Sequence, residues 1–213
     1  MDIHSAVLRV KHSILCAEVG TTKLRAAELS LPGMSGHKVR HLLNSLCDWP
    51  NTVYLEIGLY QGSTFWSALC GNDMFALGID NWSGCPRGHF DLHADRYRGR
   101  NRVAIMDCDA LSHPFPPYPE QLPGPFNVFF YDGPHSAEEH RLAVRCWLHA
   151  TCAHPAIFVV DDWNLPEVRS GTMAGLEGGR TFDRHLLYSR EFFTDWNGDV
   201  TGWWNGLFVG VVG

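Results

Sequence analysis

"YLEIGLYQGST", residues 54–64, joins an apolar run to an acid, two glycines four positions apart, and a Ser–Thr pair. The apolar run predicts a strand over 52–57, and the residues after the turn predict a helix over 63–70. Glycine allows a tight turn and lets the backbone approach a ligand closely. The stretch therefore predicts a strand–turn–helix unit with open main chain at the strand's carboxyl end.

Strand-like and helix-like segments alternate along the rest of the chain. Further strands are expected at 74–80, 102–107, 126–131 and 155–161, and further helices at 90–98, 136–150 and 182–195. Most of these strands are near-continuous apolar runs, which is typical of parallel strands buried on both faces. Asn205-Gly206 between two apolar stretches predicts a closing hairpin. The expected fold is α/β: a doubly wound (Rossmann-like), mostly parallel seven-stranded sheet with a C-terminal antiparallel hairpin and helices on both faces.

The N-terminal part is expected to precede the main domain as a helical arm. Residues 1–34 form a predicted helical arm, with short helices at 3–17 and 22–29, and residues 35–213 form the main domain. Ser35 is the expected N-cap of the helix before the first strand, because the apolar positions that follow it have helical spacing. The proline-rich 113–125 region is expected to be a long connection.

Composition excludes several classes of protein. The chain has 213 residues, 45% of them hydrophobic and 19% charged, with a formal net charge of −6. It therefore lacks the basic field that gathers nucleic acid, and no segment approaches the ~20 apolar residues of a membrane span. The seven cysteines are odd in number and contain no C-x-x-C pair. Since no secretory signal is evident either, we expect a reduced, cytoplasmic protein that binds neither nucleic acid nor membrane.

Acids stand at three successive strand ends. Glu56 precedes the glycine turn, Asp80 ends the second strand, and Asp109 follows the third. Glu56 would repel an anion but attract a ligand with an ammonium or sulfonium group, and Asp80 is well placed to accept hydrogen bonds from ribose hydroxyls. Each feature has an alternative: the glycine turn could merely pack helix on strand, and each acid could be a cap or turn residue.

The fourth and fifth strands end in a second acidic group. Asp132 and His135 follow the fourth strand, and Asp161 and Asp162 follow the fifth. Three converging carboxylates repel one another unless they are protonated or bind a cation, and an all-oxygen site suits Mg²⁺. A neutral histidine near pH 7 can accept a hydroxyl proton. The alternatives are a His135 that only enters a helix and an acidic pair that only starts a loop.

Taken in order, the motifs E-x-G-x-x-x-G, "GID", "DCDA", "FYDGPH" and "VVDDW" resemble class I S-adenosylmethionine-dependent methyltransferases. The nearest group has D-G-x-H after the fourth strand, as in small-molecule and sugar O-methyltransferases. The likeness covers roughly residues 33–213. It departs from the catechol-type enzymes in having Asp162 where they have Asn, and His135 where they have Lys.

The resemblance implies specific roles at matching positions. It assigns the methionine end of the cofactor to Glu56, Gly58, Gly62 and Ser63. It assigns the ribose and adenine to Asp80, Trp82, Asp109 and Ala110. It assigns a metal ion to Asp132, Asp161 and Asp162.

We therefore predict transfer of a methyl group from S-adenosylmethionine to a hydroxyl of a small molecule, with His135 and Asp132 as catalytic residues and possible help from Mg²⁺. A binding protein that keeps the fold without turnover is the first alternative. A nicotinamide-dependent oxidoreductase is the second, although the G-x-G-x-x-G fingerprint is absent from the sequence. A homodimer is compatible with the N-terminal arm and the aromatic tail.

Overall fold

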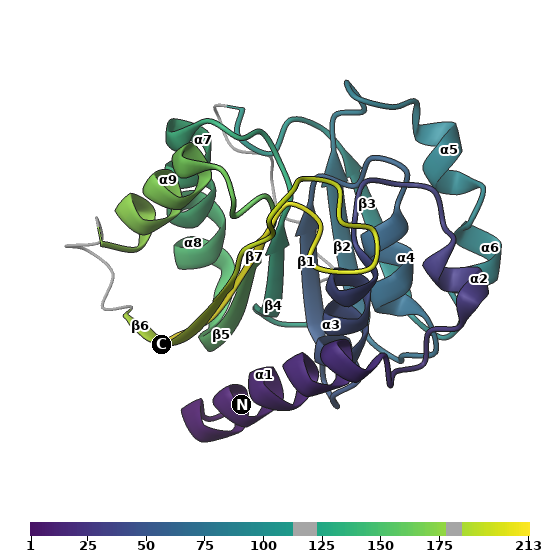
Figure 1. The fold of residues 1–213 in the computed structure, drawn as a ribbon, viewed down its shortest axis with the longest axis horizontal. Coiled ribbons are helices and arrows are strands. Elements are labelled where there is room, and N and C mark those ends of the chain that lie inside the picture. Colours follow the sequence, from purple (N-terminus) through teal and green to yellow (C-terminus); the bar gives the residue numbers. More distant parts are fainter. Residues whose placement is uncertain (113–122, 178–184) are drawn as a thin grey trace.

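The computed structural model describes residues 1–112, 123–177 and 185–213, and within them seven strands form one sheet (Figure 1). The strands are β1 (Val53–Ile57), β2 (Phe75–Asp80), β3 (Arg102–Asp107), β4 (Phe126–Tyr131), β5 (Cys152–Val160), β6 (Leu186–Phe192) and β7 (Leu207–Val212). Their order is β3-β2-β1-β4-β5-β7-β6, and β7 alone runs in the direction opposite to the other six strands. The predicted doubly wound, mostly parallel seven-stranded sheet is confirmed.

The chain reverses its direction across the sheet between β1 and β4. From β1 it adds β2 and β3 on one side, then returns to place β4 against the other side of β1. Ligands of such sheets bind at the carboxyl ends of the strands beside this switch point. The fold therefore marks the ends of β1 and β4 as the place for a site.

Helices cover both faces of the sheet, with α1, α3 and α4 on one face and the helical segment from α7 to α9 on the other (Figure 1). The helices are α1 (Ile3–Val19), α2 (Ala26–Leu29), α3 (His37–Cys47), α4 (Ser63–Leu69), α5 (Arg87–Asp91), α6 (Ala94–Tyr97), α7 (Ala137–Ala143), a π-helical turn (Val144–Leu148), α8 (His149–Thr151) and α9 (Pro166–Glu177).

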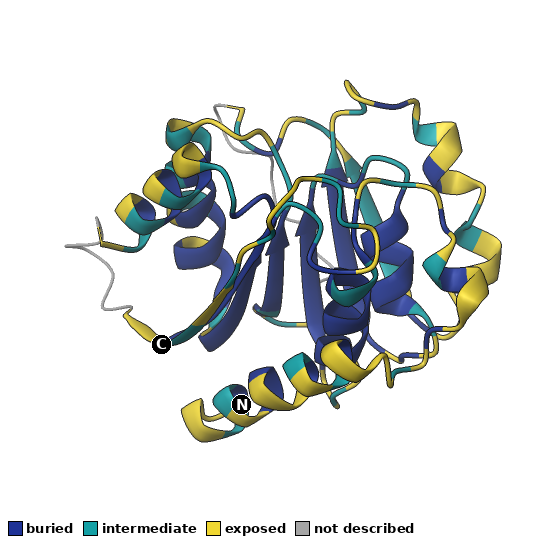
Figure 2. Ribbon diagram, in the orientation of Figure 1, coloured by how far each residue is buried: buried dark blue, intermediate teal, exposed yellow. Residues whose placement is uncertain are grey.

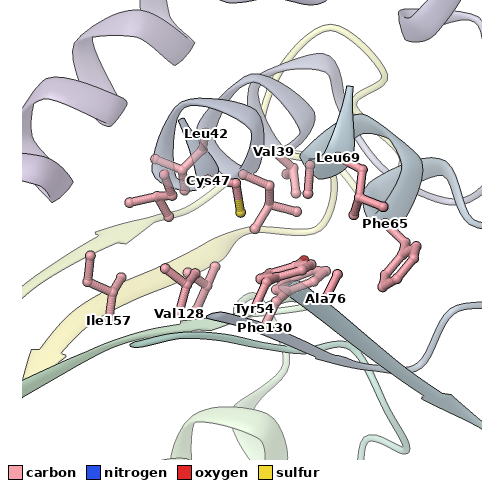
Figure 3. Close-up of a cluster of buried hydrophobic side chains, with 14 of the residues drawn as sticks. Val39, Leu42, Cys47, Tyr54, Phe65, Leu69, Ala76, Val128, Phe130 and Ile157 are labelled. Carbon is pink, nitrogen blue, oxygen red and sulfur yellow. The ribbon is translucent and has the colours of Figure 1, made fainter. Parts of the chain in front are cut away.

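Successive residues of a strand point to opposite faces of the sheet and pack into two separate hydrophobic cores. In β1, Tyr54 packs into the core under α3 and α4, whereas Leu55 packs into the core under α7 and α9. Figure 3 shows the first of these, with Tyr54, Val128 and Phe130 of the sheet facing Leu42 of α3. The central strands are buried along their length (Figure 2), which explains why their sequences are continuously apolar.

Backbone hydrogen bonds continue past the strand ends and hold the tips together. The Gly58 amide donates to the Ile79 carbonyl at 3.0 Å, and the Asp132 amide donates to the Ile57 carbonyl at 2.9 Å. Gly58 has φ 91°, and a Cβ there would lie 1.9 Å from the Asp132 carbonyl oxygen. The turn after β1 therefore touches the end of β4 directly, which a side chain at position 58 would prevent.

Several local predictions are confirmed. The predicted helices over 3–17 and 63–70 correspond to α1 and α4, and the helix predicted from residue 136 begins as α7, where Ser136 and Glu139 form a capping box. The helix expected over 90–98 is instead two short helices, α5 and α6, and the one expected over 22–29 is shortened to α2. Of the proline-rich connection, residues 113–122 lie outside the described residues.

The predicted role of Ser35 as an N-cap is wrong. Gly36 occupies the N-cap of α3 and makes no side-chain cap bond. The Ser35 hydroxyl instead accepts a hydrogen bond from Nε of buried Arg40 at 2.8 Å and lies 3.0 Å from the Ser63 hydroxyl. The hydroxyl thus bonds a side chain further along α3 and contacts α4 instead of capping the first turn of α3.

The C-terminal predictions were partly wrong. Residues 186–192 of the expected 182–195 helix form β6, because they pair with β7 at the sheet edge, and residues 178–184 lie outside the described part of the chain. The closing antiparallel pair is thus β6–β7, whereas the expected 205–206 hairpin is absent: near it Asp199 and Trp204 form only an isolated bridge. The helix α9 was not predicted, although Pro166 at its first position is a recognised start signal.

None of the helices in the described ranges combines the length and apolar character needed to cross a bilayer.

The contact at Gly58 gives a test of the fold. Gly58→Ala is expected to lower the free energy of unfolding by about 3 kcal/mol or more, because it adds backbone strain and a clash with the Asp132 carbonyl. Urea denaturation measures the change. Gly88→Ala is the matched control, since Gly88 lies exposed in α5 with nothing within 4 Å of the added carbon. Equal stability of the two variants would contradict the contact.

Candidate functional site

A cavity of about 390 Å³ lies at the carboxyl ends of the central strands. Its walls come from the turns after β1, β2, β4 and β5, from the segment after β3, and from Met34, Trp204 and Asn205. Sites for small molecules have volumes of roughly 300–1,000 Å³, so the cavity is large enough for one nucleoside-sized ligand. Because the strands lie in the order β3-β2-β1-β4-β5, the cavity has a β3 end and a β5 end.

Asp80 organises the middle of the cavity wall. Its Oδ2 accepts the amides of Leu59 and Tyr60 at 2.7 and 2.9 Å, and its Oδ1 accepts the amide of Trp82 at 2.6 Å. These bonds fix the turn after β1 against the end of β2. Carboxylate oxygens have further lone pairs, so Asp80, which lines the cavity, can still accept hydrogen bonds from a ligand.

Glu56 lies beneath the cavity and is absent from its lining. The carboxylate is fully buried and accepts hydrogen bonds from the Tyr54 hydroxyl at 2.5 Å and the Thr64 hydroxyl at 2.6 Å. Burial raises the pKa of Glu56 to about 8, although these two hydrogen bonds act in the opposite direction. Thr64 does line the cavity, so Glu56 can act on a ligand through Thr64.

The two glycines of the opening motif have different surroundings. Gly58 lines the cavity, whereas Gly62, with φ 85°, packs against Trp66 and Phe90 and does not. Ser63, the first residue of α4, is buried and lines the cavity.

At the β3 end, Asp109 and Ala110 line the cavity as predicted for an adenine site. The Asp109 carboxylate accepts the Leu111 amide at 2.8 Å, which fixes this turn. Trp82 lies beside the cavity, but its indole donates to Asp107 at 2.9 Å and is not part of the wall. Trp82 therefore shapes the loop after β2.

At the β5 end, three side chains form a hydrogen-bonded row. Nε2 of His135 lies 2.8 Å from Oδ2 of Asp162, and the Asn205 amide donates to Oδ1 of Asp162 at 2.6 Å. Burial alone would raise the pKa of Asp162, but the bonds from His135 and Asn205 outweigh it, so the pKa lies below its usual value. The same bond to Asp162 raises the pKa of His135. Asn205 was not predicted as a site residue, because it follows β5 by more than forty positions and nothing local marks it.

Asp132 also lines this end, and its environment is acidic. Burial and the nearby charges of Asp161 and Asp162 raise the pKa of Asp132 well above its usual value. Asp161 does not line the cavity wall: it is buried, and its Oδ1 accepts the Asp162 amide at 2.9 Å. Burial raises the pKa of Asp161 well above its usual value as well.

The predicted magnesium ligands are only partly brought together. Ligand atoms of Asp132, His135 and Asp162 lie within 4.8 Å of one another, so His135 stands where Asp161 was expected. Mg²⁺ prefers an octahedron of oxygens, and a set with one imidazole does not match it. His135 and Asp162 are also already bonded to each other. We therefore assign no step of a reaction to magnesium.

No family model matches the sequence, and no curated protein matches it. Solved structures do match the fold. An O-methyltransferase from Bacillus cereus, in complex with S-adenosylhomocysteine, has a TM-score of 0.57 at 14% identity, over 98% of this chain and 100% of that one. The fold is that of the class I S-adenosylmethionine-dependent methyltransferases.

Other matches show how widely this fold is used. A precorrin 8w decarboxylase from Methanobacterium thermoautotrophicum has a TM-score of 0.56 at 19% identity, over 86% of this chain and 94% of that one. TrmN from Thermus thermophilus has a TM-score of 0.54 at 15% identity, over 88% of this chain and 52% of that one. The chain thus spans about half the length of TrmN, and also about half that of a matched Streptococcus mutans protein. At these identities the likeness establishes the fold, and the reaction must be argued from the site.

Behind the row, His140 of α7 is buried against Tyr131, with the two ring centroids 4.8 Å apart. Its Nδ1 lies 3.2 Å from the Thr172 hydroxyl of α9. Burial, and then the nearby charge of His135, lower the pKa of His140 to about 4. His140 is thus a neutral packing residue at physiological pH.

His140 predicts a contribution to stability that is lost in acid. The unfolded chain binds a proton near pH 6.5 and the folded chain only near pH 4, so stability is full above pH 6.5 and falls as the pH drops between these values. By pH 5 the loss is about 2 kcal/mol. The free energy of unfolding is measured in urea at pH 7 and at pH 5. In His140→Gln the decrease between pH 7 and pH 5 should lack the contribution of His140, whereas exposed His89→Gln should show the wild-type decrease. An unchanged pH difference in His140→Gln would contradict the assignment.

Proposed function

We propose that the chain transfers a methyl group from S-adenosylmethionine to a hydroxyl of a small molecule. The observation that carries this proposal is the row of His135, Asp162 and Asn205 at one end of a nucleoside-sized cavity in a methyltransferase fold. The cavity supplies room for the cofactor, and the row supplies a base.

The cofactor would lie across the strand ends, with its adenine at the β3 end. Asp109 and Ala110 would border the adenine, and Asp80 would accept the ribose hydroxyls. Gly58 and Ser63 would contact the methionine part, where the wall is main chain and a small hydroxyl. A positive charge bound nearby would favour the ionised forms of the buried acids beneath and beside it.

This order leaves the reactive end of the cofactor near β4 and β5. S-adenosylmethionine supplies a methyl group made electrophilic by the sulfonium. The acceptor hydroxyl would lie beside His135, at the same end of the cavity. Alignment of the reacting atoms then lowers the barrier by sparing the entropy of their encounter.

His135 is suited to take the hydroxyl proton. Asp162 is ionised and can only accept a hydrogen bond, so Nε2 of His135 carries the proton of their bond. In the neutral form of the ring Nδ1 is then unprotonated and can accept the proton of the acceptor hydroxyl as the oxygen attacks the methyl carbon. Asp162 stabilises the imidazolium that results, and Asn205 holds the Asp162 carboxylate in place.

Cofactor binding gives the first test. Wild-type protein is expected to bind S-adenosylhomocysteine in calorimetry, and Asp80→Ala should weaken binding at least tenfold, because it removes the ribose acceptor and loosens the turn after β1. Asp73→Ala is the matched control, since exposed Asp73 lies just before the opposite end of β2. Absence of any binding by wild-type protein at millimolar ligand would overturn the proposed function.

Catalysis gives the second test. His135→Asn should lower the rate of methyl transfer by roughly 10²–10⁴-fold, the usual contribution of a general base, and change the affinity for S-adenosylhomocysteine less than twofold. Exposed His4→Asn in α1 serves as the control and should keep the wild-type rate. Transfer is measured with tritiated S-adenosylmethionine and a panel of hydroxyl compounds. If the protein binds the cofactor but methylates nothing in the panel, the binding-protein alternative is favoured. If His135→Asn keeps the wild-type rate, His135 is not the base.

A further inference from the structure

Two segments far apart in the sequence meet at the β5 end of the cavity. The His37 amide donates to the Val200 carbonyl at 2.7 Å, and the Lys38 amide donates to the Gly202 carbonyl at 3.2 Å. A Cβ at Gly36 would lie 2.2 Å from the Gly202 carbonyl oxygen, so the two backbones are in close contact. We call residues 33–38 and 199–205 the mouth segments. The first places Met34 in the cavity wall, and the second places Trp204 there.

Buried Arg40 anchors the first mouth segment. Its guanidinium donates to the carbonyls of Leu29 and Leu31 at 3.0 and 2.9 Å and to the Ser35 hydroxyl at 2.8 Å. Ser35 in turn contacts Ser63 of the cavity wall at 3.0 Å. The backbone that carries Met34 is therefore fixed on both sides, even though the Met34 side chain itself is 57% exposed.

The second mouth segment is anchored as firmly. Trp203 stacks on Phe192 with ring centroids 4.0 Å apart and donates from its indole to Glu18 at 3.2 Å. Asn205 accepts the Gly198 amide at 2.8 Å while it donates to Asp162. Trp204 lies between these two anchored residues in the chain. Its backbone is therefore fixed beside Asn205, which bonds Asp162 of the His135–Asp162 pair.

The charge of the cavity wall is one-sided. Among the described residues that line it there is no Lys or Arg, whereas four carboxylates are present. Asp80 and Asp109 belong to the cofactor end, and Asp132 and Asp162 belong to the acceptor end. An acceptor with a phosphate or carboxylate would meet the negative charge of Asp162 there and find no Lys or Arg in the described wall.

We propose that the acceptor is a small hydroxylated ring compound without negative charge, bound between Met34 and Trp204 with its hydroxyl at His135. The proposal rests on the proposed function and names its substrate class. An indole face and a thioether bind the flat or C–H face of a ring, and the carboxylates favour a neutral or amine-bearing ring over an anionic one. The same charges disfavour a nucleic acid acceptor, which is polyanionic.

The test uses protein saturated with S-adenosylhomocysteine and ligand-observed NMR with millimolar ring compounds in matched charge states. One set is methyl glucoside, glucosamine and glucose 6-phosphate; the other is 4-ethylphenol, tyramine and 4-hydroxyphenylacetate. Neutral and amine-bearing members should bind at least tenfold more tightly than the anionic member of the same set. Trp204→Ala and Met34→Ala should each lower the affinity for the neutral and amine-bearing members at least fivefold. The affinity for S-adenosylhomocysteine should stay within twofold of the wild-type value.

The control variants are Trp196→Ala and Leu92→Ala, which remove side chains that are 63% and 76% exposed and do not line the cavity. Both should bind the ring compounds as wild-type protein does. The inference is overturned if the anionic members bind best, if Trp204→Ala leaves binding unchanged, or if no member binds to the cofactor-loaded protein. Failure to bind S-adenosylhomocysteine in the first place would instead defeat the proposed function.

Discussion

The contact between the turn after β1 and the end of β4 is the constraint on which the site depends. Because position 58 has no side chain, the Asp132 carbonyl approaches the turn closely, and the amides of Gly58 and Asp132 extend the sheet's hydrogen bonding beyond its strands. A cavity opens just above this contact. A larger residue there would separate the two strand ends whose turns form the cavity floor.

Around this contact, the acids at the ends of neighbouring strands differ in whether they line the cavity. Glu56 and Asp161 are buried, and burial raises the pKa of each. Asp80 and Asp162 also accept hydrogen bonds, but unlike Glu56 and Asp161 they line the cavity. The distinction separates acids that support the wall from acids that can act on a ligand, although all of them stand at strand ends in the sequence.

The parts of the fold that depend on local pattern could be predicted from the sequence, and those that depend on distant partners could not. The parallel strands were predictable because they are buried on both faces, and the α7 capping box because its two residues bond only to each other. Residues 186–192 have a pattern compatible with a helix and become a strand only through pairing with β7. Ser35 has a local capping role available to it, but its hydroxyl bonds buried Arg40 and contacts Ser63, which is 28 positions away in the chain.

The sequence by itself determined the doubly wound sheet and which acids, Asp80 and Asp132 among them, stand at its carboxyl edge. Burial of apolar runs and the fixed direction of parallel strands suffice for that. Only the tertiary structure decided that Glu56 lies under the cavity, that His135 pairs with Asp162, and that Asn205 joins them. These outcomes depend on which side chains far apart in the chain come within hydrogen-bond distance, and no local pattern contains that information.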